Sequence, residues 1–256
     1  MKGKAEGEEG RKKKIVLFTG AGTSAEAGIP TFRTDEGSFW STDHPMEVAN
    51  IITFRRNACG NRETSRVFHN KLRQLVSVTE PTEFHHAVRQ WQLTAKARSI
   101  DFHIITQNVD DLFEKAGVED VQHIHGDIRY LQCLAFNHKF FVGYEEQGKD
   151  IRCPQCNCGV IKSGTVFFDE DAPLYSPVMK LLKSLGNGDV LLVLGTSCTV
   201  FPLEQFLKNM RPFKVYNALE MPEGLDPLYF DRVYLEPCTS AINRIRNDVG
   251  NLGNLS

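Results

Sequence analysis

A glycine turn near the start of the chain has the residue types that bind phosphate. Gly20-Ala21-Gly22 follows a short apolar run, residues 15–18, and precedes small residues suited to a closely packed helix. A strand, a glycine turn and a helix together let the backbone approach a pyrophosphate and direct N–H groups at it. The third glycine of the series is Gly28, which departs from the common dinucleotide-binding spacing. The turn therefore predicts a phosphate-binding loop without identifying the nucleotide.

Three polar residues that could take part in proton transfer or ligand binding follow two further apolar runs. Asn108 and Asp110 follow one run, and His125 ends the next. A carboxylate accepts hydrogen bonds from a ribose hydroxyl or a carboxamide, and histidine is a general base near neutral pH. Each also has a structural interpretation, since Asn and Asp often cap helices and a lone histidine is often a core residue. A regular strand would turn His123 to the same side, so the pattern leaves open which histidine is functional.

The cysteines in the middle of the chain have the spacing of metal ligands. Cys153 and Cys156 form a C-x2-C pair, and Cys133 lies upstream. A structural zinc site needs four ligands, but the residue three positions after Cys133 is phenylalanine, so the first pair is incomplete. Cys158 or His138 could supply the fourth ligand. The alternative is a metal-free module with free thiols.

Two more polar segments follow predicted strands in the second half of the chain. Gly195-Thr196-Ser197 is a small polar turn after an apolar run, and Asn217 follows a shorter run. Such a turn suits contact with phosphate oxygens, although an ordinary strand-to-helix loop has the same composition.

The elements that must position these residues alternate along the chain. We expect strands at 15–18, 100–106, 121–125, 190–194, 214–216 and 232–235, and helices at 63–78, 82–97, 110–116, 177–185, 203–210 and 240–248. This alternation predicts a doubly wound parallel sheet, which binds ligands beyond the carboxyl ends of its strands. All the polar motifs above except the cysteines follow a strand, so we predict one shared site.

Composition excludes several classes of protein. The chain has 256 residues, is 41% hydrophobic and carries a net charge of -2, which gives no electrostatic case for direct nucleic-acid binding. No run approaches membrane-spanning length, and the polar residues 1–14 lack the apolar segment of a secretory signal. Lys12-Lys13-Lys14 is a solvated tail or a basic targeting patch. An odd number of cysteines, seven, favours metal binding over disulfides. We therefore expect an intracellular, cytoplasmic protein, with the nucleus as the alternative; the oligomeric state is not indicated.

Together these motifs strongly resemble the sirtuin (Sir2-type) family of NAD-dependent protein deacylases. The matching pieces cover residues 15 to about 245 and are, in chain order, Gly20–Arg33, Thr106–Asp110, His125-Gly126, Cys153–Cys156, Val166–Glu170, Gly195–Ser197 and Asn217. The resemblance implies a Rossmann-like large domain, a small domain made of a helical insertion and a zinc ribbon, and a cleft where NAD meets an acyl-lysine protein or peptide.

The family's domain organisation transfers to the chain as follows. We expect a flexible tail at 1–13, a single catalytic unit at 14–248 and a second tail at 249–256. Within that unit the large domain comprises 14–44, 98–130 and 164–248, and the small domain comprises the insertions 45–97 and 131–163.

The resemblance also assigns roles to individual residues. His125 is implied as the general base, with Asn108 and Asp110 as further catalytic residues. NAD binding is implied for Gly20, Ala21, Gly22, Ser24, Ala25, Ile29, Phe32, Arg33, Gln107, Asn108, Asp110, Gly195, Thr196, Ser197, Asn217 and Cys238. Substrate binding is implied for His125, Val166, Phe167 and Phe168, with the peptide added as a strand beside them. Structural Zn²⁺ is implied at Cys133, Cys153, Cys156 and Cys158, with His138 as the other candidate for the fourth ligand.

The chain departs from the family's pattern at the predicted substrate groove. Asp169 stands where the family usually has glycine, which bears on peptide preference. His69 and Leu72 stand where the desuccinylase subgroup has the tyrosine and arginine that grip an acidic acyl group. Without that guanidinium we expect weak activity on succinyl-lysine and a preference for acetyl or longer neutral acyl groups. The alternatives to deacylation are NAD hydrolysis, ADP-ribosyl transfer to protein, and a non-catalytic NAD-binding module.

Overall fold

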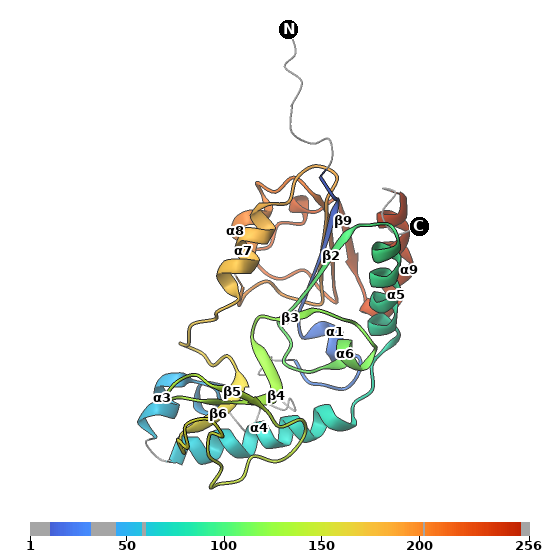
Figure 1. Cartoon of the computed structure of the whole chain (residues 1–256). Coiled ribbons are helices and arrows are strands. Elements are labelled where there is room, and N and C mark those ends of the chain that lie inside the picture. The colour runs from blue at the N-terminus through green and yellow to red at the C-terminus, as the bar shows by residue number, and fades with distance from the viewer. Residues whose placement is uncertain (1–10, 32–44, 58–59, 202, 252–256) are drawn as a thin grey trace.

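The computed structural model describes residues 11–31, 45–57, 60–201 and 203–251. Its larger part is built on a parallel sheet of six strands in the order β3-β2-β1-β7-β8-β9 (Figure 1). The strands are β1 (Lys14–Thr19), β2 (Asp101–Thr106), β3 (Val121–His123), β7 (Val190–Leu194), β8 (Phe213–Ala218) and β9 (Arg232–Leu235). The chain leaves β1 for β2 and returns on the other side of β1 as β7. The gap beyond the ends of β1 and β7 is therefore the topological switch point, where doubly wound sheets bind their ligands.

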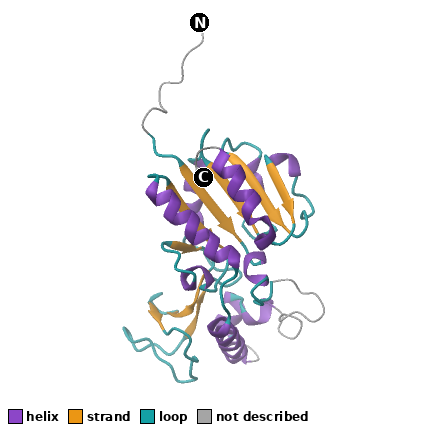
Figure 2. Ribbon diagram, turned by 90° about the vertical axis from the view of Figure 1, so that its right-hand side faces the viewer, coloured by secondary structure: helices purple, strands orange, loops and turns teal. Residues whose placement is uncertain are grey.

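Helices cover both faces of this sheet, which explains why its central strands are continuously apolar. Alternate residues of β1 belong to two separate cores: Ile15 and Leu17 pack with α5 (Glu83–Ala97) and α9 (Cys238–Asn251). Val16 and Phe18 pack with α7 (Tyr175–Lys183) and α8 (Glu204–Leu207). Figure 2 shows the sheet as the middle layer of the larger part, above the smaller part.

The smaller part combines a three-stranded antiparallel sheet with short and long helices. Its strands lie in the order β5-β4-β6, and its helices share one buried cluster with Ile128 and Phe167. The elements are α2 (Pro45–Val48), α3 (Ile51–Arg56), α4 (Asn61–Val78), β4 (Gly126–Cys133), β5 (Lys139–Phe141) and β6 (Ile161–Thr165). The remaining short helices, α1 (Gly22–Ala25), α6 (Leu112–Lys115) and the 3-10 helix η2 (Pro227–Tyr229), lie in connecting segments.

Several expected elements differ in extent from those observed. The predicted strand 121–125 ends at His123, and the predicted helix 240–248 begins at Cys238 and continues to Asn251. Helix α5 packs on the large sheet through Phe84 and Trp91, whereas the sequence analysis grouped it with the small domain. A helical period alone does not say which of two apolar surfaces the helix will cover. Among the described residues, no helix has the length and apolar character needed to cross a bilayer.

Candidate active site

A cavity of about 1070 Å³ lies beyond the carboxyl ends of β1 and β7 and extends to the small domain. We call its two sides the sheet side, formed by Gly20–Gly22, Gly195–Ser197 and Cys238, and the aromatic side, formed by Phe68, His69, Leu72 and Phe167. The cavity brings together predicted site residues from distant parts of the chain: Gly20, Ala21, Gly22, Ala25, Gln107, Asn108, His125, Val166, Phe167, Phe168, Gly195, Thr196, Ser197 and Cys238.

The other predicted site residues fall into two groups. Ser24, Ile29, Asp110 and Asn217 are buried, and none of them forms part of the described cavity lining. Phe32 and Arg33 lie outside the described residues. The chain just before them does reach the cavity, because Thr31 forms part of its wall.

The glycine turn packs against the turn after β7 so closely that side chains are excluded. A Cβ atom on Gly20 would lie 2.6 Å from the Cβ of Thr196, and one on Gly22 would lie 2.9 Å from the Cα of Gly195. Helix α1 is a single turn, and the backbone N–H groups of Gly22, Thr23 and Ser24 already bond to protein carbonyls. The expected row of free helix N–H donors is therefore absent at these three residues. The turn instead offers a close backbone approach.

Asn108 ties the β2 end to the glycine turn. Its side-chain amide donates to the Gly20 carbonyl at 3.1 Å, to Thr23 Oγ1 at 3.1 Å and to Ser24 Oγ at 2.8 Å. Asp110 is buried beside it, and burial raises the pKa of its carboxyl although bonds to Ser24 and the Leu112 N–H oppose the shift. The capping interpretation of Asp110 is therefore partly right, since the Leu112 N–H begins α6.

The two candidate histidines point to different surroundings because β3 ends at His123. The His123 ring bonds to the Asn108 carbonyl at 2.9 Å and to Glu114 Oε1 at 2.8 Å. Both partners accept, so both ring nitrogens donate. Burial lowers the pKa of His123, but the hydrogen bond and charge of Glu114 outweigh it and the net shift is upward. Arg129 also contacts Glu114 at 2.9 Å. His123 thus belongs to a structural ion-pair network.

His125 is the histidine that lines the cavity. Its Nδ1 donates to the Gln107 carbonyl at 3.0 Å, which leaves the lone pair on Nε2. Nε2 lies 2.8 Å from the hydroxyl of Tyr175. Burial lowers the pKa of His125, against the opposing hydrogen bond to Gln107, so the ring is neutral and basic at neutral pH. Sequence reasoning missed Tyr175, because none of the motifs includes it.

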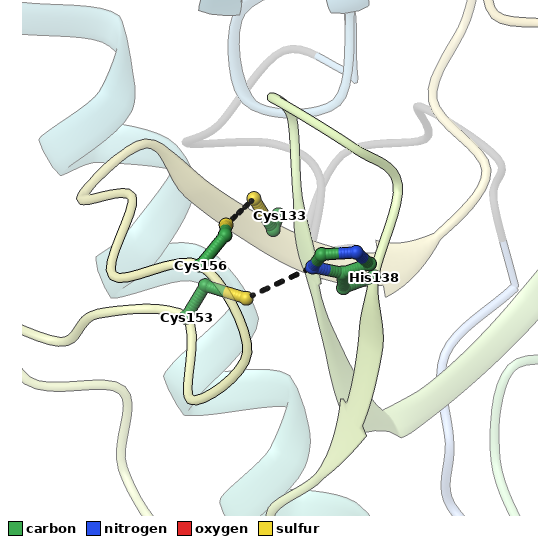
Figure 3. Close-up of side chains that lie close together, drawn as sticks. All are labelled: Cys133, His138, Cys153 and Cys156. Atoms are coloured by element: carbon green, nitrogen blue, oxygen red, sulfur yellow. Dashed lines mark hydrogen bonds between the residues drawn. The ribbon is translucent and has the colours of Figure 1, made fainter.

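Three small-domain cysteines lie together with a histidine where β4 ends and β5 begins (Figure 3). The four donors are Cys133, His138, Cys153 and Cys156, and their ligand atoms all lie within 4.8 Å of one another. Two pairs, Cys133 Sγ with Cys156 Sγ and Cys153 Sγ with His138 Nδ1, are 3.5 Å apart. Zinc at about 2.3 Å from each thiolate separates ligands by roughly 3.8 Å, so the donor set fits a structural zinc ion.

The fourth member of this group is His138, whereas the sequence analysis placed Cys158 first. Cys158 lies beside the group: its side chain interacts with that of Cys133, and its Sγ accepts from the Val160 N–H at 3.4 Å. The hairpin from β4 to β5 brings His138 back beside Cys133, whose N–H bonds to the His138 carbonyl at 2.9 Å. Ligand spacing along the chain could not show this pairing.

Comparison with known proteins agrees with this site. The chain matches the model of the Sir2 family over residues 20–202. It is 34% identical over 253 residues to an NAD-dependent protein deacylase of Helicobacter hepaticus, with 92% of this chain and 97% of that protein covered. An NAD-dependent protein deacylase of Campylobacter jejuni is 34% identical over 239 residues, with 93% and 97% covered. This chain belongs to the Sir2 family.

Solved structures extend the likeness to the fold. A Sir2 homologue in complex with NAD has a TM-score of 0.76 and 27% identity, with 94% of this chain and 91% of that chain covered. A mutant Sir2 homologue in complex with ADP-ribose has a TM-score of 0.77 and 26% identity, with 96% and 95% covered. The predicted Rossmann-like architecture with a small zinc-ribbon-like domain is therefore confirmed.

The aromatic side of the sirtuin's cavity is apolar and neutral. The His69 ring stacks on Phe167 with ring centroids 5.2 Å apart, and its Nδ1 donates to the Ser65 carbonyl at 2.7 Å. Burial lowers the pKa of His69 to about 3, so this ring carries no charge at neutral pH. Leu72 completes the wall. Arg73 is fully buried, and its guanidinium donates to the Ile128 carbonyl and to Asn70 Oδ1.

Lys162 is a second buried cation beside this aromatic side, and it is paired with Glu170. Its ammonium lies 3.0 Å from Glu170 Oε2 and 4.4 Å from the centroid of the Phe167 ring. It also donates to the Thr165 carbonyl at 2.6 Å. The pair therefore supports the wall and does not present a free positive charge to the cavity.

The sequence analysis placed Asp169 where the family usually has glycine. Its backbone conformation explains why either residue suits this position. It has φ of 59°, the left-handed region that glycine enters freely and that Asp tolerates better than most residues. Asn50 steadies it by donating from Nδ2 to Asp169 Oδ2 at 2.8 Å, while Asn50 Oδ1 caps α3.

Asn217 and Glu26 organise the other edge of the sheet side. Asn217 Nδ2 donates to the carbonyls of Tyr234 and Glu236 at 2.9 and 2.8 Å, and so fixes the segment that leads into α9. Glu26 Oε1 accepts from the Cys238 N–H at 2.6 Å at the start of α9. The sequence analysis missed this role of Glu26, because Glu26 precedes Cys238 by 212 residues and nothing local in the sequence pairs the two.

Proposed function

We propose that this sirtuin is an NAD-dependent protein-lysine deacylase that releases nicotinamide and O-acyl-ADP-ribose, with a preference for acetyl and longer neutral acyl groups. The observation that carries the proposal is the placement of His125 Nε2, with its lone pair, on a cavity that joins the sheet side to the aromatic side. Its relatives named NAD-dependent protein deacylase support the same reaction.

The sheet side has the features that suit a dinucleotide. The side-chain-free contact of Gly20 and Gly22 with the turn after β7 leaves backbone and hydroxyl groups of the 195–197 turn facing the cavity. Gln107, whose Nε2 donates to Thr196 Oγ1 at 2.8 Å, links this region to His125. NAD, when bound, supplies an activated ribose carbon and nicotinamide as the leaving group.

The residues of this chain have distinct tasks in that reaction. His125 accepts a proton at Nε2 from a ribose hydroxyl, because its Nδ1 proton is committed to Gln107. Asn108 and Asp110 fix the glycine turn and the entrance of α6, which orients the ribose and carboxamide binding groups. The apolar aromatic side excludes water, so the acyl oxygen meets the ribose carbon without competition from hydrolysis.

Acyl preference follows from the aromatic side. A succinyl group would bring a carboxylate against Leu72 and a neutral His69, while Lys162 is held by Glu170. Arg73 donates from Nε and Nη1 to the Ile128 carbonyl and Asn70 and has a buried Nη2 without a hydrogen-bond partner, but it is not part of the described cavity lining. Burying an unpaired carboxylate costs roughly several kcal/mol, and the described cavity lining contains no lysine or arginine to offset that cost. Acetyl, propionyl and butyryl groups would meet uncharged side chains on the described aromatic side: Phe68, Leu72, Phe167 and the neutral His69 ring.

The substrate peptide lies along Val166, Phe167 and Phe168 in this proposal. The backbone N–H groups of these residues donate within the protein, to the His125 carbonyl, Glu170 Oε2 and the Ala49 carbonyl. The carbonyls of Phe167 and Phe168 also accept within the protein, from the N–H groups of Glu170 and Ile51. An added peptide strand would therefore use the Val166 carbonyl or neighbouring residues as its partners.

A cytoplasmic location is also part of the proposal, supported by the absence of disulfides among the six described cysteines.

The test is mass spectrometry of a reaction containing NAD and an acetyl-lysine peptide. Deacetylated peptide and O-acetyl-ADP-ribose are expected, with a loss of at least about 100-fold in His125→Ala. His86→Ala, on the exposed face of α5, is the matched histidine control and should retain full activity. ADP-ribose without the acyl ester, or nicotinamide release with unchanged acetyl, propionyl and butyryl peptides, would replace deacylation by NAD hydrolysis or ADP-ribosyl transfer.

A further inference from the structure

Tyr175 is the residue whose contact with the reactive nitrogen needs an explanation. It is the first residue of α7, it lines the cavity, and its hydroxyl lies 2.8 Å from His125 Nε2. Because Nδ1 donates to Gln107, Nε2 can only accept, so the tyrosine hydroxyl is the donor. A neutral imidazole nitrogen has one lone pair. Tyr175 and a ribose hydroxyl therefore cannot both donate to it.

We propose that Tyr175 is a positioning residue that competes with the ribose hydroxyl for the lone pair of His125 Nε2 and must be displaced when NAD binds, so that it sets the affinity for NAD. This inference rests on the deacylase function proposed above. In this proposal Tyr175 weakens NAD binding and takes no part in the proton transfer itself.

The surroundings of Tyr175 hold its ring in place. The ring packs edge-on against Phe201 with centroids 5.0 Å apart, and Phe201 in turn lies 5.1 Å from Phe18 of β1. Burial raises the pKa of Tyr175, so its hydroxyl remains protonated and able to donate at neutral pH. The ring is anchored in the core below the sheet, and only the hydroxyl reaches His125.

The groups around His125 leave Tyr175 as the decisive neighbour. The ring lies between the Gln107 carbonyl and the tyrosine hydroxyl. The described cavity wall carries the acidic residues Asp169, Glu170 and Asp171 on the segment before Tyr175. Glu170 is paired with Lys162, Asp169 is bonded to Asn50, and Asp171 is exposed to solvent. When a ligand displaces the tyrosine hydroxyl from Nε2, the hydroxyl remains half-buried and loses its hydrogen-bond partner. In a variant without this hydroxyl, a water would take its place and, when displaced, would regain its hydrogen bonds in solvent. Replacing Tyr175 by phenylalanine should therefore make ligand binding easier.

The experiment compares the wild type with Tyr175→Phe in two measurements that need no turnover. Calorimetry with ADP-ribose should show about two- to tenfold tighter binding by the variant, the range of one hydrogen bond. NMR titration of His125 in the free protein should show a higher pKa in the variant, because the donor that favours the neutral ring has been removed. Tyr144→Phe is the matched control: it removes a hydroxyl bonded to Asp111, away from His125, and should change neither result.

Steady-state kinetics add a pattern that a purely structural role would not produce. In Tyr175→Phe the KM for NAD should fall while kcat stays within about twofold, and the acid limb of kcat/KM should move to higher pH with the His125 pKa. A drop in melting temperature with unchanged ADP-ribose affinity and unchanged His125 pKa would reduce Tyr175 to a packing residue and overturn the proposal. A large loss of kcat at constant KM would overturn it in favour of a proton relay. Inactivity of the wild type towards acyl peptides would refute deacylation but leave the binding and titration results standing.

Discussion

The sheet side and the aromatic side of the cavity are built in different ways. On the sheet side, two backbone turns touch so closely that Gly20 and Gly22 admit no Cβ, and the surface is shaped by main chain. On the aromatic side, α4 contributes side chains such as His69 and Leu72, which can change without moving the backbone. A site of the first kind holds one ligand class, and a site of the second kind can be retuned. We therefore expect variation among substrates to arise on the aromatic side.

Removing zinc should have the largest effect, and the effect should differ between the two sides of the cavity. The buried cluster around the four candidate zinc ligands contains two cysteines and only two other buried residues, Leu131 and Ile161. The three-stranded sheet and its cysteine loop therefore have little hydrophobic core without the metal. A chelator should abolish deacylation but leave ADP-ribose affinity within about threefold, because the sheet side lies on a separate core. Equal loss of both would show that the sheet side depends on the ribbon.

The same experiment decides the fourth ligand. His138→Ala should lose most of its zinc in elemental analysis, whereas Cys158→Ser should keep about one zinc per chain. The reverse result would restore Cys158 as the ligand and make the observed grouping of His138 incidental.

Gly22→Ala should impair ligand binding on the sheet side and leave the aromatic side unchanged. The new Cβ would lie 2.9 Å from both Cα and carbonyl oxygen of Gly195, backbone atoms that cannot rotate away. We expect ADP-ribose affinity to fall more than about tenfold and stability to fall by about 1–3 kcal/mol. Gly148→Ala, where nothing lies within 4 Å, is the control for the substitution itself. Calorimetry and thermal denaturation measure both effects, and normal ADP-ribose binding by Gly22→Ala would contradict the close-packing argument.

The difference between the sides also explains what could be predicted from the sequence. Parallel strands bring their carboxyl ends to one edge, so Gly20, Asn108 and Gly195 could be grouped from their positions after apolar runs. The residue pattern alone could not choose between His123 and His125, because the choice depends on β3 ending at His123; the family resemblance was needed to assign His125. Side-chain partners from later elements, such as Tyr175 on His125, depend on how α7 packs on the sheet, and local periodicity carries no record of that contact.

Leu72→Arg should retune the aromatic side without disturbing the sheet side. A guanidinium at this wall would give an acidic acyl group a bidentate partner, which the neutral His69 cannot supply. The ratio of succinyl to acetyl activity should rise about tenfold or more, with ADP-ribose affinity unchanged. Leu72→Met keeps the volume without the charge and should leave the ratio as it is. Strong succinyl activity in the wild type would instead show that Arg73 or another cation already reaches the pocket.

Asp169→Gly should have the smallest effect, because two opposing changes meet at one residue. Glycine relieves the cost of a side chain at φ of 59°, but it also removes the bond from Asn50, so stability should change by less than about 1 kcal/mol. The exposed carboxylate lines the cavity beside the proposed peptide groove, where its loss would weaken the attraction for basic residues. The KM of an acetyl peptide flanked by lysines should rise about two- to threefold, and that of an acid-flanked peptide should fall, both most clearly at low salt. Identical changes for the two peptides would show that Asp169 acts through the backbone it shapes and not through its charge.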